Sequence, residues 1–241
     1  MQTDSIWHFS EWERYKEIIH GISTISYGDC VDVSNQKKFF TTLGLSWEHA
    51  VSAEQIHANA LHIVSSSDKG KCISGVDALL LQKSESTKDM SLMIRIADCT
   101  PIFFYDTKNT SIGLAHAGWK GIVGHIEKAV VLRMIEMGSR MSDIQIAIGP
   151  HIGPCCYHVE ADRAHIFSQE FGEDVIVKRD SNVFVDFDAC LTREALEVGV
   201  DEKNIVRANV CTYHANDTFF SCRRNPKNFG EMIAVLGFAI V

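Results

Sequence analysis

Short apolar runs separated by polar turns dominate the chain and predict strands. Each run has about four to seven residues, a length typical of buried strands. One longer segment has a different period: over residues 121–137, apolar side chains recur at helical spacing and predict a helix of about four turns. The predicted strands span residues 49–52, 61–65, 78–82, 91–96, 102–106, 112–116, 144–148, 174–177, 183–187, 206–211, 218–222 and 232–238.

Four other segments predict shorter helices, at residues 12–19, 35–43, 159–171 and 190–198. Gly44 and Gly199 directly follow two of them, and glycine is common just past a helix C-terminus. Strands and helices follow one another without a composition break, repeat or proline-rich linker. We therefore expect residues 1–241 to form a single layered α+β domain with a mixed β-sheet and flanking helices.

Composition and charge favour an ordinary globular protein. Of the 241 residues, 46% are hydrophobic and 22% are charged, and the net charge is −8, which argues against a general nucleic-acid or anionic-membrane binder. The first residues do not resemble a signal peptide, and no apolar run approaches the roughly 20 residues of a membrane span. We expect a cytoplasmic protein with a small-molecule substrate, whose eight scattered cysteines are mostly reduced thiols.

Candidate chemistry lies at the ends of predicted strands. Cys99 and His116 each follow an apolar run and enter a turn rich in Pro, Gly or Ala, and His57 lies upstream in another turn. A soft thiolate with two imidazoles suits zinc, and three protein ligands leave a position open for water or substrate. Taken alone, each residue is also compatible with an ordinary core position. Asp98 is either a partner that orients an imidazole or a strand-end carboxylate.

Other motifs give less information about function. Trp119 stands where a P-loop requires lysine, and the chain contains no Gly-x-Ser-x-Gly, His-Glu-x-x-His or Gly-x-Gly-x-x-Gly segment, so those hydrolase and nucleotide-binding classes are excluded. The adjacent Cys155 and Cys156 follow Gly153 and Pro154. This setting favours thiols that pack beneath a turn over a redox or metal role.

Five motifs occur in the order expected of the laccase-domain family, which is also called YfiH-like or multicopper polyphenol oxidase-like. The resemblance covers residues 21–238 of the chain. The motifs are Gln-Ile-His at 55–57, Ala-Asp-Cys-Thr-Pro at 97–101, His-Ala-Gly-Trp-Lys-Gly at 116–121, Ile-Gly-Pro-His-Ile-Gly-Pro-Cys-Cys-Tyr at 148–157 and Phe-Phe-Ser-Cys-Arg-Arg at 219–224.

This resemblance implies an α+β fold with His57, Cys99 and His116 as metal ligands and catalytic centre. It implies a zinc-dependent purine nucleoside phosphorylase that acts on adenosine, inosine, guanosine and methylthioadenosine and also deaminates adenosine. The implied partners are purine nucleosides and phosphate. The family has also been described as copper-dependent polyphenol oxidases, and some members are linked to the editing of peptidoglycan precursors.

Phosphorolysis requires a group that holds phosphate in line with the sugar. The candidates are Lys120, Arg223 and Arg224, together with the start of the helix after Gly121. Two departures from the family pattern remove positive charge, because Ile25 and Glu231 stand where many members have arginine. If these arginines contact phosphate in other members, we expect phosphorolysis here to be weaker, altered in substrate, or served by Arg223 and Arg224 instead.

Three alternatives to this expectation stay open. In the first, the protein is a cysteine hydrolase acting on cell-wall precursors, with Cys99 as nucleophile and His116 as base. In the second it is a copper-dependent polyphenol oxidase, although no two of its histidines are separated by a single residue, unlike the paired His-x-His segments of blue multicopper oxidases. In the third it binds nucleosides without turnover, and Ile25 and Glu231 mark the lost activity.

Overall fold

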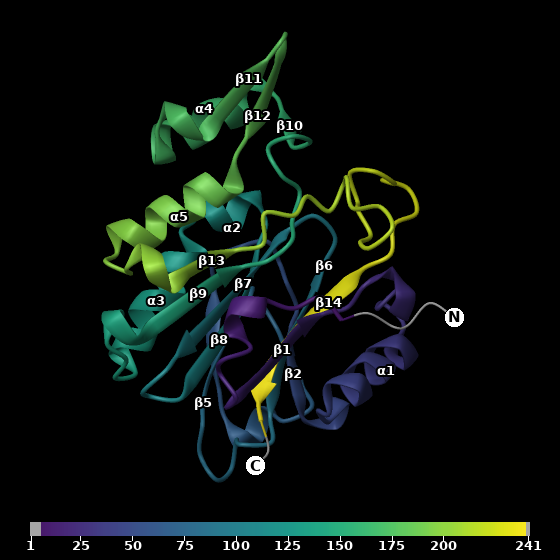
Figure 1. Ribbon diagram of the computed structural model, residues 1–241, viewed down its shortest axis with the longest axis vertical. Coiled ribbons are helices and arrows are strands. Elements are labelled where there is room, and N and C mark those ends of the chain that lie inside the picture. The colour runs from purple at the N-terminus through teal and green to yellow at the C-terminus, as the bar shows by residue number, and fades with distance from the viewer. Residues whose placement is uncertain (1–5, 240–241) are drawn as a thin grey trace.

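Two β-sheets packed face to face form the centre of the protein (Figure 1). The computed structural model describes residues 6–239. One sheet has five strands in the order β1-β14-β6-β2-β4, and the other has six in the order β13-β9-β7-β8-β5-β3. Both sheets contain parallel and antiparallel pairs. Their strands are β1 (Ile18–Ile22), β2 (Ala50–Ala53), β3 (Leu61–Val64), β4 (Cys72–Ile73), β5 (Ala78–Gln82), β6 (Ser91–Ile96), β7 (Thr100–Asp106), β8 (Ser111–Ala117), β9 (Ile144–Ile148), β13 (Ile205–Arg207) and β14 (Met232–Phe238).

A third, antiparallel sheet lies with one helix at the upper end of Figure 1. Its strands are β10 (His158–Val159), β12 (Asn182–Val185) and β11 (Ile176–Arg179), in that spatial order. The helix is α4 (Ala161–Phe171), whose Phe167 and Phe171 join the core beneath the six-stranded sheet.

Helices cover the outer faces of both large sheets. α1 (Val33–Leu43) packs Phe39 and Phe40 against the five-stranded sheet, and its Asp32 cap and left-handed Gly44 define its ends. α2 (Trp119–Val123), α3 (Ile126–Glu136) and α5 (Phe187–Glu197) cover the six-stranded sheet. Short 3₁₀ helices lie at Ser10–Trp12, Ile25–Tyr27, Trp47–His49, Ser66–Asp68, Met141–Asp143, Glu173–Val175 and Glu202–Asn204.

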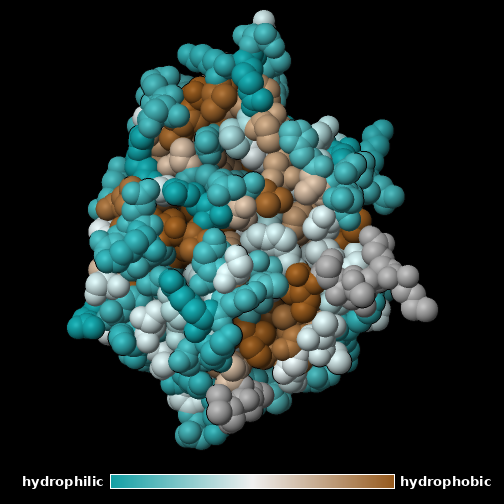
Figure 2. Space-filling view, viewed as in Figure 1, coloured by the Kyte–Doolittle hydropathy of each residue, from teal (hydrophilic) through white to brown (hydrophobic). Residues whose placement is uncertain are grey.

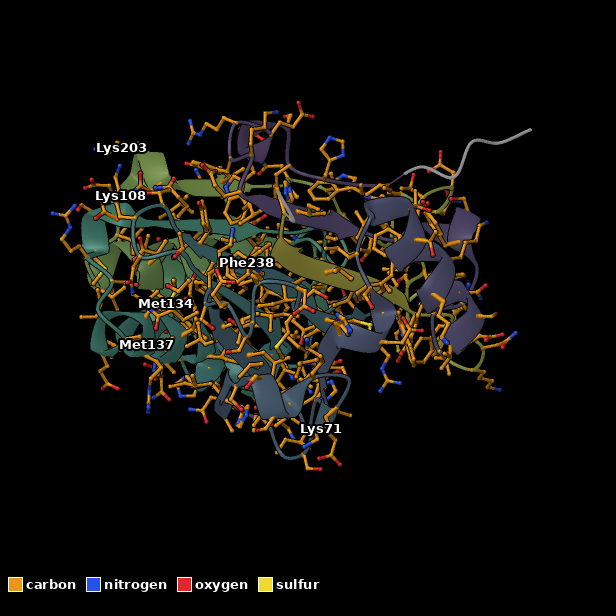
Figure 3. All side chains as sticks on the ribbon, turned by 90° about the horizontal axis from the view of Figure 1, so that it is seen from below. Lys71, Lys108, Met134, Met137, Lys203 and Phe238 are labelled. Atoms are coloured by element: carbon orange, nitrogen blue, oxygen red, sulfur yellow. The ribbon has the colours of Figure 1, made fainter. Side chains whose placement is uncertain are left out.

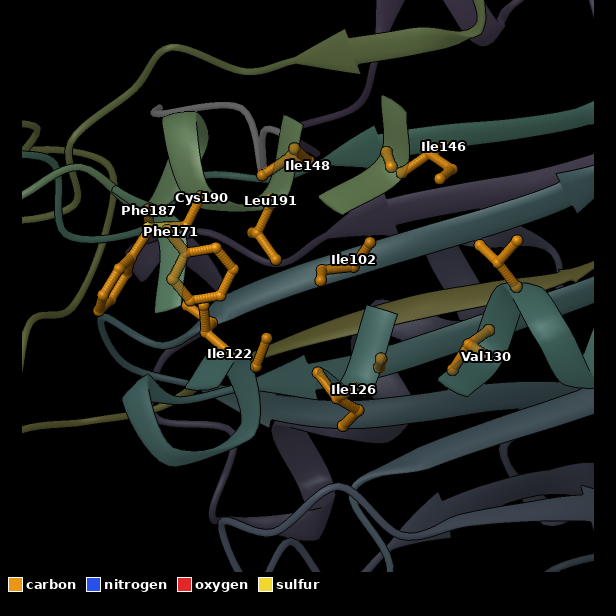
Figure 4. Packing of buried hydrophobic residues seen from close by; sticks show 14 of the residues in the cluster. Ile102, Ile122, Ile126, Val130, Ile146, Ile148, Phe171, Phe187, Cys190 and Leu191 are labelled. Carbon is orange, nitrogen blue, oxygen red and sulfur yellow. The ribbon is translucent and has the colours of Figure 1, made fainter. Parts of the chain in front are cut away.

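The alternation of side chains along the central strands separates two cores. In β5, Leu79 and Leu81 pack between the two sheets while Leu80 packs beneath the helices, as the two-residue period of a strand requires. Figure 4 shows the second of these cores, where Ile102 of β7 and Ile146 of β9 face Ile126 of α3. In the view from below (Figure 3), side chains fill the space between the ribbons. Long buried runs such as β7 and β8 are apolar on both faces because both faces are covered.

These observations confirm the α+β class and most predicted elements, with four corrections. The expected single mixed sheet is divided into three sheets. The predicted helix at 12–19 is wrong: Ser10–Trp12 forms a 3₁₀ turn, and Ile18–Ile22 is a strand paired with β14, a partner far away in sequence. The predicted strand at 218–222 is also wrong, because Ser221 instead donates to Asp98 and the carbonyl of Phe219 accepts from Arg224.

The long helix predicted at 121–137 is interrupted. It begins at Trp119, and His125 adopts a left-handed φ of 60° between α2 and α3. The side chain of His125 contacts Glu194 and Glu170, and the carbonyl of Gly124 accepts from Asn59. These tertiary contacts replace the helical hydrogen bonds that the local pattern predicts.

The surface is mixed in character. Figure 2 shows a mainly hydrophilic face with hydrophobic residues in separate patches. Among the helices of residues 6–239, none combines the length and the apolar character needed to cross a membrane.

Glu127 of α3 provides a test of the core beneath the six-stranded sheet. Its side chain is fully buried, and neither carboxyl oxygen has a hydrogen-bond partner among the described residues. Burial, reinforced by nearby Glu194, raises its pKa well above the ordinary 4.5. The native state therefore holds the Glu127 proton more tightly than the unfolded chain does. The free energy of unfolding consequently decreases as the pH rises above the pKa of the unfolded chain.

Glu127→Gln removes the titrating group, so we expect the variant to gain stability relative to the parent protein as the pH rises above 4.5. The difference between their free energies of unfolding should grow by at most about 1.4 kcal/mol per pH unit. Urea unfolding at about pH 5 and about pH 8 measures this difference. Glu197→Gln, at an exposed position of α5, is the matched control and should show no such trend. A pH-independent effect of Glu127→Gln would contradict the assignment.

Candidate metal centre

His57, Cys99 and His116 meet where the chain crosses between the two large sheets. His57 lies in the connection from β2 to β3, and Cys99 lies in the turn from β6 to β7. In both places the chain leaves the five-stranded sheet and enters the six-stranded one. His116 lies near the end of β8, paired with Pro101 of β7. The topology therefore brings together three residues that are far apart in sequence.

Gln55 joins the first two of these segments. Its side-chain amide donates to the carbonyl of Arg95 at 2.6 Å and accepts from the Arg95 amide at 2.7 Å. These bonds continue the pairing of β2 with β6 beyond the end of β2. They explain physically why glutamine precedes the histidine in the 55–57 motif.

A buried carboxylate holds both histidines. One oxygen of Asp77, which has no exposed surface, accepts from His116 Nδ1 at 2.9 Å and from the His57 amide at 3.0 Å. The other oxygen accepts from the Ala58 amide at 2.8 Å. With Nδ1 as donor, His116 leaves Nε2 free to bind an ion, which is the arrangement typical of metal-ligating histidines.

Backbone geometry at the site is unusual at several residues, and Gln55 has a φ of 66°. His57 has a φ of 59° and Asp98 a φ of 84°, a left-handed region that costs non-glycine residues about 1–2 kcal/mol. Gly118 is needed for a different reason: a Cβ there would lie 3.0 Å from the His57 ring and 3.4 Å from Cys99 Sγ. The close packing of these groups therefore depends on a glycine in the 116–121 motif.

The three side chains form an electrostatically coupled set. Burial raises the pKa of Cys99, but hydrogen bonds from His116 and His57 outweigh this effect and lower the pKa to about 7. Burial lowers the pKa of His116, but Asp77 and Cys99 raise it to about 9. The hydrogen bond to Cys99 is the main reason that the pKa of His57 is raised. The polypeptide thus favours a thiolate at Cys99, which is the form that binds metals.

The donor set fits a zinc ion in geometry as well as in chemistry. The three ligand atoms lie within 4.8 Å of one another, and Cys99 Sγ lies 4.0 Å from His57 Nε2. A sulfur and a nitrogen bound to the same zinc are at most about 4.4 Å apart. Small side-chain rotations would therefore bring these residues to bonding distance, with one position left open.

The centre opens into a pocket of about 210 Å³. Its lining includes Arg95, whose Nε lies 3.3 Å from Glu231 Oε2. Phe229, which is 37% exposed, lies at the same pocket. The full lining is Glu54, Gln55, His57, Arg95, Ala97, Cys99, His116, Cys222, Phe229 and Glu231. The pocket therefore combines the candidate metal ligands with two carboxylates, one cation and an aromatic ring.

The predicted phosphate residues are not part of the lining of this pocket. Lys120 is exposed in α2, with Nζ 5.9 Å from the centre of the Trp119 ring. Arg223 is also exposed; it donates to the carbonyl of His158 and lies over the ring of Tyr157. Their roles toward phosphate stay predictions.

Arg224 has a more definite structural position. Its guanidinium donates to the carbonyls of Thr212, Tyr213 and Phe219 at 2.6–2.9 Å. These bonds fold the segment that carries Arg223 and Arg224 against residues 212–213. The geometry assigns Arg224 a positioning contact, and its predicted role toward phosphate stays untested.

Asp98 is also a positioning residue. Its carboxylate accepts from Thr212 Oγ1 at 2.6 Å, from Ser221 Oγ at 2.9 Å and from the Arg223 amide at 2.7 Å. The sequence predicts that Asp98 either orients an imidazole or is an ordinary carboxylate at a strand end. The structure supports neither role. Asp98 anchors the 212–223 segment beside Cys99.

Sequence reasoning missed Asp77, Arg95 and Phe229. A single charge directly before the apolar run of β5 was the available signal for Asp77, because a carboxylate at the start of a buried strand needs partners. Arg95 interrupts the apolar run of β6 in the same way. Phe229 lies in a polar loop without a distinguishing pattern.

Comparisons with known proteins agree with this architecture. Residues 24–239 match the family model described as multi-copper polyphenol oxidoreductase laccase. A relative named purine nucleoside phosphorylase YlmD, from Geobacillus stearothermophilus, is 31% identical over 217 residues, which cover 85% of this chain and 78% of the relative. A protein named adenosine deaminase RL5, from an unknown prokaryotic organism, is 28% identical over 200 residues, covering 78% of this chain and 75% of that protein. The crystal structure of YlmD from Geobacillus stearothermophilus superposes with a TM-score of 0.88 at 27% identity, covering 100% of this chain and 98% of that one.

The contacts of Asp77 lead to a prediction about metal affinity. Asp77→Asn removes the charge that orients His116 and weakens the bonds to the 57–58 backbone, so we expect zinc affinity to fall by about 10–100-fold. Competition with a chromophoric chelator measures this change. Asp68→Asn is the control, because it removes a similar contact, to His62 at 3.0 Å, outside the pocket. Equal zinc affinity in Asp77→Asn and the parent would contradict the role given to Asp77.

Proposed function

The chain belongs to the multi-copper polyphenol oxidoreductase laccase family, and on this basis we propose that it is a zinc-dependent enzyme of purine nucleosides. The proposed reactions are phosphorolysis of adenosine, inosine, guanosine and methylthioadenosine, and deamination of adenosine. Relatives named purine nucleoside phosphorylase and adenosine deaminase support this class of activity.

One observation carries the proposal. His57, Cys99 and His116 converge at a pocket, with their ligand atoms within 4.8 Å of one another and with Asp77 fixing both histidines. A thiolate and two imidazoles at the base of an open pocket are the donor set of a catalytic zinc site, in which three protein ligands leave room for water or substrate. A bound zinc ion supplies a water whose pKa is lowered to about 7.

The other pocket residues fit a purine. Phe229 presents an exposed ring at the pocket, and aromatic rings stack on nucleobases. The pocket volume of about 210 Å³ is below the roughly 300–1,000 Å³ of typical ligand sites. A nucleoside would therefore extend out of it, across Phe229. Glu54 and Glu231 are the carboxyl groups available to exchange protons with a departing purine or amine.

Charge in the pocket favours deamination over phosphorolysis. Arg95 is the cation in the lining, and its partner Glu231 neutralises it at 3.3 Å. A phosphate ion would enter next to two carboxylates and compete with Glu231 for Arg95. We propose that Arg223 and Lys120, both exposed, assist phosphate at the pocket rim. Deamination needs no such anion.

A cysteine hydrolase is the second candidate. The position of Cys99 Sγ, 4.0 Å from His57 Nε2, and the pKa of Cys99 near 7 also suit a nucleophilic thiolate with a neighbouring base. This reading predicts activity in metal-free protein and covalent trapping of Cys99. The zinc reading predicts that both are absent.

The native metal is a separate question. A thiolate with two imidazoles binds copper as well as zinc, and intrinsic affinity is higher for copper. We propose zinc as the working metal, and polyphenol oxidation as a property of copper-loaded protein. Reconstitution of apoprotein with each metal, followed by nucleoside and phenol assays, separates the two.

The central test uses adenosine. With zinc-loaded protein, we expect inosine to form without phosphate, and free base to form only when phosphate is present. Cys99→Ala should lose both reactions by a factor of at least about 100, because a ligand of the catalytic centre is removed. Product chromatography measures both. Cys72→Ala, at an exposed cysteine of β4, is the control. Zinc-loaded parent protein that leaves a panel of purine nucleosides unchanged, with and without phosphate, would overturn the proposal.

The pocket charge leads to a second expectation. Glu231→Gln frees Arg95 from its ion pair, so we expect KM for phosphate in phosphorolysis to fall, by about 3–10-fold as for one partly exposed charge pair. Deamination measured without phosphate should not gain from the change. The double variant Glu231→Gln with Arg95→Met should lose the improvement. An unchanged KM for phosphate in Glu231→Gln would show that Arg95 is not the anion contact.

A further inference from the structure

A second group of cysteines lies outside the pocket, where two loops run side by side. One loop follows β9 and contains Cys155 and Cys156, and the other follows β13 and contains Cys211. β9 and β13 are parallel neighbours, so both loops leave the same end of the sheet (Figure 1). A β-bridge between His151 and Cys211 keeps the loops together beyond the strands.

Four potential ligands converge from these loops. The ligand atoms of Cys155, Cys156, Cys211 and His214 all lie within 4.8 Å of one another. Cys155 Sγ is 3.5 Å from His214 Nδ1, and Cys156 Sγ is 3.3 Å from His214 Nε2. The three cysteines are half-buried and His214 is exposed. The sequence predicts thiols packed beneath a turn, and in the structure both Cys155 and Cys156 also contact a histidine of another loop.

We propose that these four residues bind a zinc ion that is distinct from the one at the pocket. Three thiolates and one imidazole form a closed tetrahedral set, which is typical of structural zinc sites. The separation of 3.5 Å between Cys155 Sγ and His214 Nδ1 is close to that of a sulfur and a nitrogen that share one ion at about 2.0–2.3 Å. One ring nitrogen of His214 binds the ion, and a rotation of the ring points this nitrogen at the ion.

The backbone around the cluster supports a bound thiolate. The Gly153 amide donates to Cys211 Sγ at 3.3 Å, as outer-shell donors do for metal-bound sulfur. Gly153 leaves room for this approach, because a Cβ there would lie 3.3 Å from Cys211 Cβ and 3.4 Å from Cys155 Sγ. Cys156 and Cys211 also pack against the core beneath the six-stranded sheet.

The position of the cluster gives the ion a structural role. Thr212, between two of the proposed ligands, donates to Asp98, the neighbour of Cys99. The carbonyls of Thr212 and Tyr213 accept from Arg224. An ion at Cys211 and His214 therefore fixes the segment that supports the turn of Cys99 and the Arg223–Arg224 pair. The site has no open position and would take no part in the chemistry.

Metal analysis of purified, zinc-supplemented protein tests the proposal independently of nucleoside turnover. We expect about two zinc ions per chain in the parent and about one in each of Cys99→Ala, Cys211→Ser and His214→Gln. The double variant Cys99→Ala with His214→Gln should bind close to none. Cys72→Ser is the control and should keep the parent content. His214→Gln changes an exposed side chain, so it tests the site even if Cys211→Ser does not fold.

Thiol labelling gives a second readout. In the zinc-loaded protein, we expect an alkylating reagent to modify Cys72 and to leave Cys155, Cys156 and Cys211 protected until a chelator is added. Peptide mass spectrometry assigns each modification. Protection that is released by a reductant and not by a chelator would identify a disulfide and overturn the proposal. A zinc content that is unchanged in His214→Gln and Cys211→Ser would overturn it as well, whether or not Cys99→Ala affects nucleoside turnover.

Discussion

The candidate centre depends on one buried carboxylate, that of Asp77. It has no exposed surface and accepts hydrogen bonds from the amides of His57 and Ala58 and from the His116 ring. Burial raises the pKa of Asp77, but the bonds from His116 and these amides outweigh burial and lower it. The charge is thereby retained inside the protein, and it fixes both histidines relative to β5. Without it, the left-handed turn at His57 would lose its main support.

The topology explains why the centre lies where it does. β2 and β6 are neighbours in one sheet, and the strands that follow them, β3 and β7, belong to the other. The chain therefore crosses between the sheets twice in adjacent places, and backbone that crosses is free to adopt the left-handed conformations at His57 and Asp98. The loop after β13 completes the surroundings, because it supplies Thr212, Ser221 and the Arg223 amide to the Asp98 carboxylate, and the loop after β9 adds the Ile152 amide, which donates to the Asp98 carbonyl. If the proposed second ion is bound, it holds these loops from their outer side.

The sequence predicts the parts of this structure that are local. Apolar runs located the central strands because β5, β7 and β8 are buried on both faces, and ordered motifs located His57, Cys99 and His116. Long-range pairing was not predictable: β1 depends on β14, more than 200 residues away, and was assigned in part to a helix. Asp77 was missed because its contact with His116 spans 39 residues. The approach of His214 to Cys155 across 59 residues was missed for the same reason.

Anomalous diffraction at the zinc absorption edge tests the central claim most directly. Crystals of the zinc-loaded protein should show an anomalous peak at about 2.0–2.3 Å from Cys99 Sγ and from one nitrogen each of His57 and His116. The Asp77 carboxylate should keep its bond to His116 Nδ1. A map with zinc present in the crystal but no peak bonded to these three atoms would contradict the account.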